Sequence, residues 1–93
     1  MSASPYESIC HLHTVNKPAA WNKCEGLIDT SDVVLLLEDG VYLALESDTQ
    51  CFAISADIDA RGLRGKIKDN VSLIDYDQFV ELTLRADKVC AWF

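Results

Sequence analysis

Five consecutive apolar residues, 33–37, stand directly before Glu38, Asp39 and Gly40. An apolar run of this length without a polar interruption is typical of a strand that is buried on both faces, as in the centre of a parallel sheet. The Asp-Gly pair that follows it predicts a turn. We therefore predict a central strand over 32–38, in a sheet whose two faces are both covered by other elements.

Shorter apolar runs alternate with helical stretches along the rest of the chain. Asn16, Lys17 and Pro18 supply a cap and a first-turn proline for a helix that continues to about Thr30. Besides the central strand, we predict strands over 9–15, 51–55, 71–74 and 88–93, and short helices over 41–45 and 57–63. This alternation predicts a single three-layer α/β domain over residues 9–93, with a mostly parallel sheet of about five strands flanked by helices. Residues 1–8 are expected to be a mobile lead-in.

The clearest helix of the chain begins after Asp75. Asp75 and Gln78 have the spacing of a capping box, in which each side chain satisfies the backbone amide of the other residue. Apolar and small side chains then recur at helical spacing. We predict a stripe that faces the core, made of Tyr76, Phe79, Val80, Thr83 and Leu84.

The charge of the chain bears on its possible partners. Fifteen acidic and eight basic residues give a net charge of −7, which repels phosphate backbones and disfavours direct binding of nucleic acid. The one basic cluster comprises Arg61, Arg64, Lys66 and Lys68. Its Gly-containing setting favours a solvated loop rather than an anion-binding site. With 49% hydrophobic residues in only 93, part of the surface is expected to be covered by a partner subunit.

The expected cellular compartment follows from the absence of membrane-spanning and signal segments in the sequence. No stretch approaches the ~20 apolar residues that cross a bilayer, and residues 1–8 have neither a basic nor an apolar signal region. We expect a cytoplasmic protein without a membrane partner. The irregular spacing of Cys10, Cys24, Cys51 and Cys90 is not that of a disulfide framework, so these thiols are expected to be reduced.

No motif for a cofactor is present. The chain lacks a Gly-rich phosphate loop, so nucleotide binding is not expected. Strand alternation places His11 and His13 on one face and Cys10 on the other, which does not close a metal site. Polar residues at the carboxyl ends of the expected strands are the remaining candidates for a site, although Asp39 there is better explained by its turn: His13, Thr14, Asn16, Lys17, Glu38, Asp39, Asp57, Asp75 and Tyr76.

The four cysteines divide into two groups. Cys10, Cys51 and Cys90 fall in expected strands, where cysteine usually packs as a small apolar residue. Cys24 lies on the first helix beside Lys23, a charge that favours the thiolate needed for sulfur transfer. The same residue also belongs to an apolar stripe with Trp21 and Leu27 that would face the core. Both interpretations of Cys24, a reactive thiol and a core residue, stay open.

Taken together, these segments resemble the TusB/DsrH family of sulfur-relay proteins, over nearly the whole chain after residue 9. The resemblance is carried by Leu-His-Thr-Val-Asn-Lys (12–17), Leu-Leu-Glu-Asp-Gly-Val-Tyr (36–42), Ala-Arg-Gly-Leu (60–63), Ile-Asp-Tyr-Asp-Gln-Phe-Val-Glu-Leu-Thr (74–83) and Ala-Trp (91–92). The segment between Leu45 and Cys51 is shorter than in longer family members.

This resemblance implies a DsrEFH-like fold and a subunit of a heterohexamer with two copies each of three related chains. The partners would be TusC- and TusD-like subunits in tRNA wobble-uridine 2-thiolation, or DsrF- and DsrE-like subunits in sulfur oxidation, together with a downstream sulfur carrier. The main sulfur-carrying cysteine of such complexes belongs to the TusD- or DsrE-type subunit. Cys24 matches the position of a cysteine in DsrH-type members, and is therefore the candidate sulfur acceptor here. A purely structural subunit is the alternative, and a stand-alone enzyme lacks a visible nucleophile and base.

Side chains for the interface with these partners can also be named. The expected interface residues are Trp21, Tyr42, Trp92 and Phe93. Aromatic side chains are over-represented at the centres of protein interfaces, where they bury a large apolar area.

Overall fold

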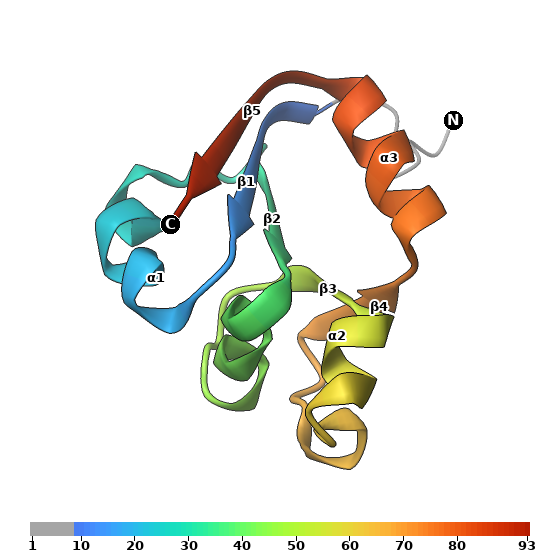
Figure 1. Cartoon of the computed structure of the whole chain (residues 1–93). Helices are drawn as coiled ribbons and strands as arrows, with labels where there is room; N and C mark the ends of the chain where they lie inside the picture. Colours follow the sequence, from blue (N-terminus) through green and yellow to red (C-terminus); the bar gives the residue numbers. More distant parts are fainter. Residues whose placement is uncertain (1–8) are drawn as a thin grey trace.

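The structure of the chain is a computed structural model that describes the backbone of residues 9–93 and the side chains of residues 11–93 (Figure 1). The expected lead-in, residues 1–8, and the side chain of Cys10 lie outside the described part. No helix within residues 9–93 is long and apolar enough to span a bilayer.

Five parallel strands form one sheet. They are β1 (Ile9–Val15), β2 (Val33–Leu36), β3 (Cys51–Ile54), β4 (Val71–Ile74) and β5 (Ala86–Trp92), in the order β4-β3-β2-β1-β5. Every neighbouring pair is parallel, which confirms the expected parallel α/β sheet. The last strand of the sequence lies beside the first (Figure 1), so β5 and β4 are the two edges of the sheet.

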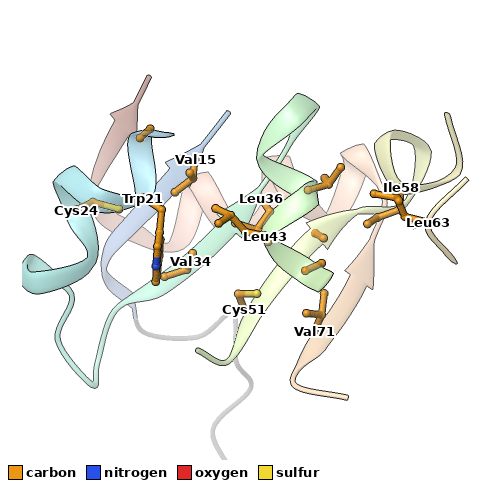
Figure 2. Packing of buried hydrophobic residues seen from close by; sticks show 14 residues of the cluster. Val15, Trp21, Cys24, Val34, Leu36, Leu43, Cys51, Ile58, Leu63 and Val71 are labelled. Carbon is orange, nitrogen blue, oxygen red and sulfur yellow. The ribbon is translucent and has the colours of Figure 1, made fainter. Parts of the chain in front are cut away.

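Helices cover the two faces of the sheet unequally. The segments α1 (Pro18–Cys24), η2 (Glu38–Leu45) and α2 (Ser55–Ala60) contribute to one core cluster, together with Val15, Val34 and Leu36 from the sheet (Figure 2). Within residues 9–93, α3 (Tyr76–Arg85) is the only helix on the opposite face, and it packs against β1 and β5. Its smaller cluster consists of Leu12, Leu35, Ile54, Ile74 and Leu82. The short 3-10 turns η1 (Glu25–Leu27) and η3 (Arg64–Lys66) complete the connections.

The first helix is shorter than expected. It ends at Cys24 and continues only as the 3-10 turn η1, so the prediction that it extends to about Thr30 was wrong. Gly26 is a poor helix former and interrupts the regular hydrogen bonding. As a result Leu27, expected on the core-facing stripe, is 65% exposed.

The second strand is also shorter than the predicted span 32–38. Beyond Leu36 the chain turns sharply, and Glu38 takes a left-handed backbone conformation with φ of 50°. The Asp57 carboxylate accepts a hydrogen bond from the Glu38 amide at 2.8 Å and holds this turn. Gly40 then passes so close to β1 that a Cβ atom would lie 1.9 Å from the Val15 carbonyl oxygen. The turn therefore requires glycine at position 40.

Other boundaries differ by a few residues. The third strand ends at Ile54 because α2 begins at Ser55, two residues before the helix expected from Asp57. This helix ends at Ala60, short of the expected Leu63, and Gly62 in its exit turn has φ of 65°. The last strand begins at Ala86, immediately after α3, and not at Lys88.

The capping box at the start of α3 is confirmed. The Asp75 carboxylate accepts from the Gln78 amide at 2.8 Å, and the Gln78 side chain accepts from the Asp75 amide at 2.9 Å. The predicted core-facing stripe is largely wrong. Leu82 is the fully buried side chain of this helix, whereas Tyr76, Val80 and Leu84 are 51%, 54% and 73% exposed. The helix therefore presents a second, outward apolar stripe.

We expect Asp75→Ala to lower the free energy of unfolding by about 1 kcal/mol, because the first turn of α3 loses its side-chain acceptor. Urea unfolding followed by circular dichroism measures this change. Asp77→Ala is the control, because Asp77 lies in the same turn but takes no part in the capping box. A loss for Asp75→Ala no larger than that for Asp77→Ala would contradict the prediction.

Candidate functional site

Cys24, the predicted sulfur acceptor, is the last residue of α1 and its side chain is completely buried. It lies in the larger core cluster with Trp21 and Val15 (Figure 2). Burial, helped by the nearby Glu25 carboxylate and opposed by a backbone hydrogen bond, raises the pKa of the Cys24 thiol above its ordinary value. In the isolated chain this environment disfavours the thiolate, so chemistry at Cys24 would require local opening around α1 and η1.

Cys51 begins β3 and is 5% exposed. Burial raises the pKa of its thiol to about 11. The expectation that Cys51 packs as a small apolar residue is confirmed. It contributes to a cavity of about 340 Å³ at the amino ends of β2 and β3, which is also lined by Ile28, Thr30, Asp32 and Phe52.

Cys90 differs from the other cysteines whose side chains are described. It lies in the edge strand β5 and is partly exposed, whereas Cys24 and Cys51 are buried. The expectation that it is a packing residue therefore does not describe its surroundings fully. Its partner across the strand pair is His13 of β1.

Four side chains form a polar network beside Cys90. Asp32 directly precedes β2, its side chain is only 2% exposed, and its carboxylate contacts two histidines of β1. His11 Nδ1 is 3.2 Å from Asp32 Oδ1, and His13 Nε2 is 3.0 Å from Asp32 Oδ2. The Asp29 amide donates to the same carboxylate at 3.0 Å, and Trp92 Nε1 donates to His13 Nδ1 at 3.0 Å.

These contacts fix the tautomer of a neutral His13 ring. The indole N–H of Trp92 can only donate, so His13 Nδ1 must carry a lone pair and accept it. The proton of a neutral imidazole is then on Nε2, from which it is donated to Asp32. Both nitrogens of His13 are thus engaged, and its ring is buried. His13 therefore cannot exchange a proton with a substrate without breaking the network.

The Asp32 carboxylate is held in its charged form. Burial acts to raise its pKa, but hydrogen bonds from His13, the Asp29 amide and His11 outweigh burial and lower the pKa of Asp32 below its ordinary value. A buried carboxylate with three donors is well solvated by the protein itself. The network joins β1, β2 and β5, and it anchors the end of the chain through Trp92.

The polar residues at the carboxyl ends of the strands mostly serve local structure. Arg61 pairs with Asp39 at 2.9 Å and with Asp57 at 3.7 Å. Arg64 pairs with Asp59, and Lys68 with Asp48. These pairs agree with the interpretation of the basic cluster as a solvated loop and leave no concentrated positive charge. Asn16 Oδ1 is buried without a hydrogen-bond partner within residues 9–93.

The expected interface residues differ in how much surface they offer. Phe93 is 70% exposed and Tyr42 is 42% exposed, while Trp92 is partly buried. Trp21 is 8% exposed and belongs to the core of this chain. Their role at an interface stays a prediction. Within the side chains described, no group of three His, Cys, Asp or Glu residues is arranged to hold a metal ion.

Comparison with known proteins gives the family. The family model for DsrH-like proteins matches residues 16–89. The chain belongs to the DsrH-like family. Curated relatives of this DsrH-like chain include Protein TusB of Yersinia pestis (strain Pestoides F), which is 45% identical over 76 residues, covering 71% of this chain and 80% of the relative. Protein TusB of Yersinia pseudotuberculosis serotype O:1b (strain IP 31758) matches with the same identity and coverage.

Sequence reasoning missed the network around Asp32. Strand alternation predicts that His11 and His13 share one face, which the structure confirms, whereas the sequence indicates Asp32 only as the start of a strand. The register that pairs Leu12 with Val33 brings Asp32 opposite His11. The sequence signal for this network is the carboxylate that directly precedes the neighbouring apolar run 33–37. His11, His13 and Trp92 lie outside the segment that the family model matches.

Proposed function

We propose that this chain is a TusB-like subunit of a cytoplasmic sulfur-relay complex, which passes persulfide sulfur toward 2-thiolation of the wobble uridine in tRNA. The 45% identity to the TusB proteins carries the proposal, because it extends over most of both chains. Membership of the DsrH-like family supports a place in a multi-subunit sulfur relay. The net charge of −7 makes direct contact with tRNA the task of a partner.

The exposed apolar surface supports an assembled form. Tyr76, Val80 and Leu84 follow one another at intervals of four residues on the outward side of α3, and Val89 of β5 is 48% exposed. A contiguous apolar stripe on a chain of this size is typical of a surface that a partner covers. TusC- and TusD-like subunits are the proposed partners, in a heterohexamer that delivers sulfur to a downstream carrier.

An interface at α3 predicts a specific mutational effect. We expect Leu84→Glu to weaken assembly with the TusC- and TusD-like chains by at least about 10-fold, because it places a charge in a desolvated contact. Fold stability should change little, since Leu84 is 73% exposed. Co-purification and analytical ultracentrifugation measure assembly. Ala56→Glu on α2 is the matched control, as an exposed helical position on the other side of the sheet. Equal loss with both variants would contradict the prediction.

Cys24 is the sulfur acceptor that the family resemblance suggests. Its complete burial means that this role would depend on assembly opening the end of α1. Mass spectrometry of the assembled complex after treatment with a persulfide donor tests it. A gain of one sulfur atom on Cys24 would support the role, and no gain would favour a subunit in which Cys24 only packs.

Complementation tests the proposed function as a whole. In a bacterium that lacks its TusB protein, expression of this chain with its TusC- and TusD-like partners should restore 2-thiouridine in tRNA, measured by mass spectrometry of tRNA digests. Complex formation without restored thiolation would overturn the proposal. That result would favour the second candidate, a DsrH-like subunit in sulfur oxidation. The match to the DsrH-like family model supports this candidate.

A further inference from the structure

The edge strand β5 and its neighbour β1 share a face that carries polar side chains. Parallel pairing places Lys88 opposite His11 and Cys90 opposite His13, so all four side chains point to the same side of the sheet. Figure 1 shows β5 lying along β1 at the rim of the sheet. A thiol, an imidazole and an ammonium group are therefore neighbours on one surface.

This surface is open at its amino end. The Lys23 ammonium at the end of α1 donates to the Phe93 carbonyl at 3.4 Å, which places α1 beside the carboxyl end of β5. Toward the amino end, Lys88 is exposed, Cys90 is partly exposed and the His11 side chain is 43% exposed. Cys90 and the His11 ring are therefore both in contact with solvent in the folded chain.

His11 is held in one orientation. Its Nδ1 is 3.2 Å from the Asp32 carboxylate, which acts as the hydrogen-bond acceptor for the Nδ1 proton. In a neutral His11 ring, Nε2 is then the nitrogen with a lone pair, and it has no hydrogen-bond partner among the described side chains. A carboxylate that orients a histidine in this way is the arrangement that prepares a histidine to take a proton. His13 cannot do so, because both its nitrogens are engaged.

His11 and Cys90 are diagonal neighbours across the strand pair, because Cys90 is paired with His13 two residues further along β1. Because neighbouring strands lie about 4.8 Å apart and a parallel strand rises about 3.3 Å per residue, the Cα atoms of this diagonal pair are about 8 Å apart, a distance that a long or aromatic side chain can span. Catalytic hydrogen bonds, such as one from the Cys90 thiol to His11 Nε2, often form only when the substrate is bound.

We propose that Cys90 is a sulfur-accepting thiol of the relay, with His11 as its proton acceptor, Asp32 as the positioning residue and Lys88 as the stabilising positive charge. The ligand is the terminal sulfur of a persulfide on a partner protein. This inference rests on the proposed sulfur-relay function and names the thiol that would serve it.

The step is a balanced transfer of one sulfur atom. The Cys90 S–H bond breaks as its proton moves to His11 Nε2, and the Cys90 sulfur attacks the terminal sulfur of the donor persulfide. A new S–S bond forms on Cys90 while the S–S bond of the donor breaks, and the donor cysteine leaves as a thiolate that takes up a proton. The products are a Cys90 persulfide and a donor thiol, and no oxidant or reductant is consumed.

The exposed amine of Lys88 completes the arrangement. The donor cysteine leaves as a thiolate, and a cation near the accepting sulfur stabilises this developing negative charge. Lys88 forms no ion pair within residues 11–93, so its charge is available for this purpose. The neighbouring Asp87 points to the other side of β5, because side chains alternate along a strand.

Thiol labelling of the isolated chain tests the site without any partner. Iodoacetamide should alkylate Cys90 at least about 10-fold faster than Cys24 or Cys51, as measured by peptide mass spectrometry, since buried thiols react only through local opening. His11→Asn retains a nitrogen donor at the Nδ1 position for Asp32 but removes the Nε2 base, and should slow labelling of Cys90 by about 10-fold. Asp87→Asn, next to Lys88 but on the other side of β5, is the matched control and should label like the unmodified chain.

In the labelling experiment, two outcomes would overturn the proposal. One is labelling of Cys90 no faster than that of Cys24. The other is a His11→Asn variant that retains its fold by circular dichroism and labels as fast as Asp87→Asn. In the second part of the test, inorganic polysulfide is added and sulfur on each cysteine is counted. One added sulfur on Cys90, reduced in His11→Asn, supports the proposal, and sulfur confined to Cys24 overturns it.

The assembled complex separates this inference from the proposed function. If Cys90→Ser assembles with its partners but no longer supports tRNA thiolation, both stand. If the Cys90→Ser complex thiolates tRNA normally, the assignment of Cys90 fails and the relay function stands. If the unmodified complex does not thiolate tRNA while Cys90 is labelled and takes up sulfur as expected, the thiol site stands and the tRNA function fails.

Discussion

Gly40→Ala should lower the free energy of unfolding by at least about 4 kcal/mol, the largest effect that we expect from a single methyl group in this chain. A Cβ at this position would lie 1.9 Å from the Val15 carbonyl oxygen and 2.7 Å from its carbon. Both atoms belong to the backbone of β1, and the Val15 oxygen also accepts from the Leu37 amide at 3.1 Å. The contact cannot be relieved by rotating a side chain, so strands β1 and β2 would have to separate.

The whole stability of a 93-residue domain is about 5–14 kcal/mol. Gly40→Ala should therefore be largely unfolded at 37 °C or lack a cooperative transition, which urea and thermal unfolding would show. Gly65→Ala is the matched control, because nothing lies within 4 Å of its Cβ position and its backbone is not left-handed. It should stay within about 1 kcal/mol of the unmodified chain. Gly40→Ala with the stability of Gly65→Ala would show that the turn after β2 is not as close to β1 as described.

Gly40 also shows what could be predicted from the sequence and what could not. The Asp-Gly pair predicts a turn after the apolar run 33–37, and the turn is there. Its contact with Val15 depends on the tertiary arrangement of two strands, about which local sequence carries no signal. The apolar run 33–37 likewise predicts a buried strand, but it does not predict the residue at which that strand ends.

In helix α3, too, a local feature was predictable from the sequence and a feature that depends on packing was not. The capping box of Asp75 and Gln78 is a local interaction and was predicted with its partners. The stripe of α3 was not, because Leu82 and not Val80 faces the sheet. Spacing alone cannot choose between two apolar stripes on one helix, since packing and the presence of a partner decide which of them is buried.

The candidate site also depends on tertiary contacts that the local sequence does not predict. Cys24 could be placed on a helix from sequence, but whether it faces solvent or the core could not, and the structure buries it. The network of Asp32 depends on strand register and on β5 returning to lie beside β1. Because 79 residues separate His13 from Trp92, no local pattern could have predicted that contact.

Replacing Asp32 by alanine should cost about 3–5 kcal/mol at pH 7, the second-largest effect that we expect. The change removes an almost fully buried carboxylate that accepts hydrogen bonds from His11, His13 and the Asp29 amide. The donors of His13 and Asp29 would then be left facing a cavity, and unpaired buried polar groups are costly. Asp69→Ala, at an exposed turn position, is the control and should leave stability nearly unchanged.

The pH dependence of this loss has a definite sign. The pKa of Asp32 is lowered in the folded chain, so the unfolded chain binds its proton more readily, and folding is favoured where the carboxylate is charged in both states. The stabilisation by Asp32 is therefore complete above the ordinary range of an aspartate, about pH 4, and is lost as the pH falls through the lower pKa of the folded state. Urea unfolding at a series of pH values measures this. The free energies of unfolding of the unmodified chain and of Asp32→Asn should differ most near neutrality and should converge below about pH 4. A difference that stays constant down to pH 3 would mean that the charge of Asp32 contributes nothing, and that only the shape of the side chain holds β1, β2 and β5 together.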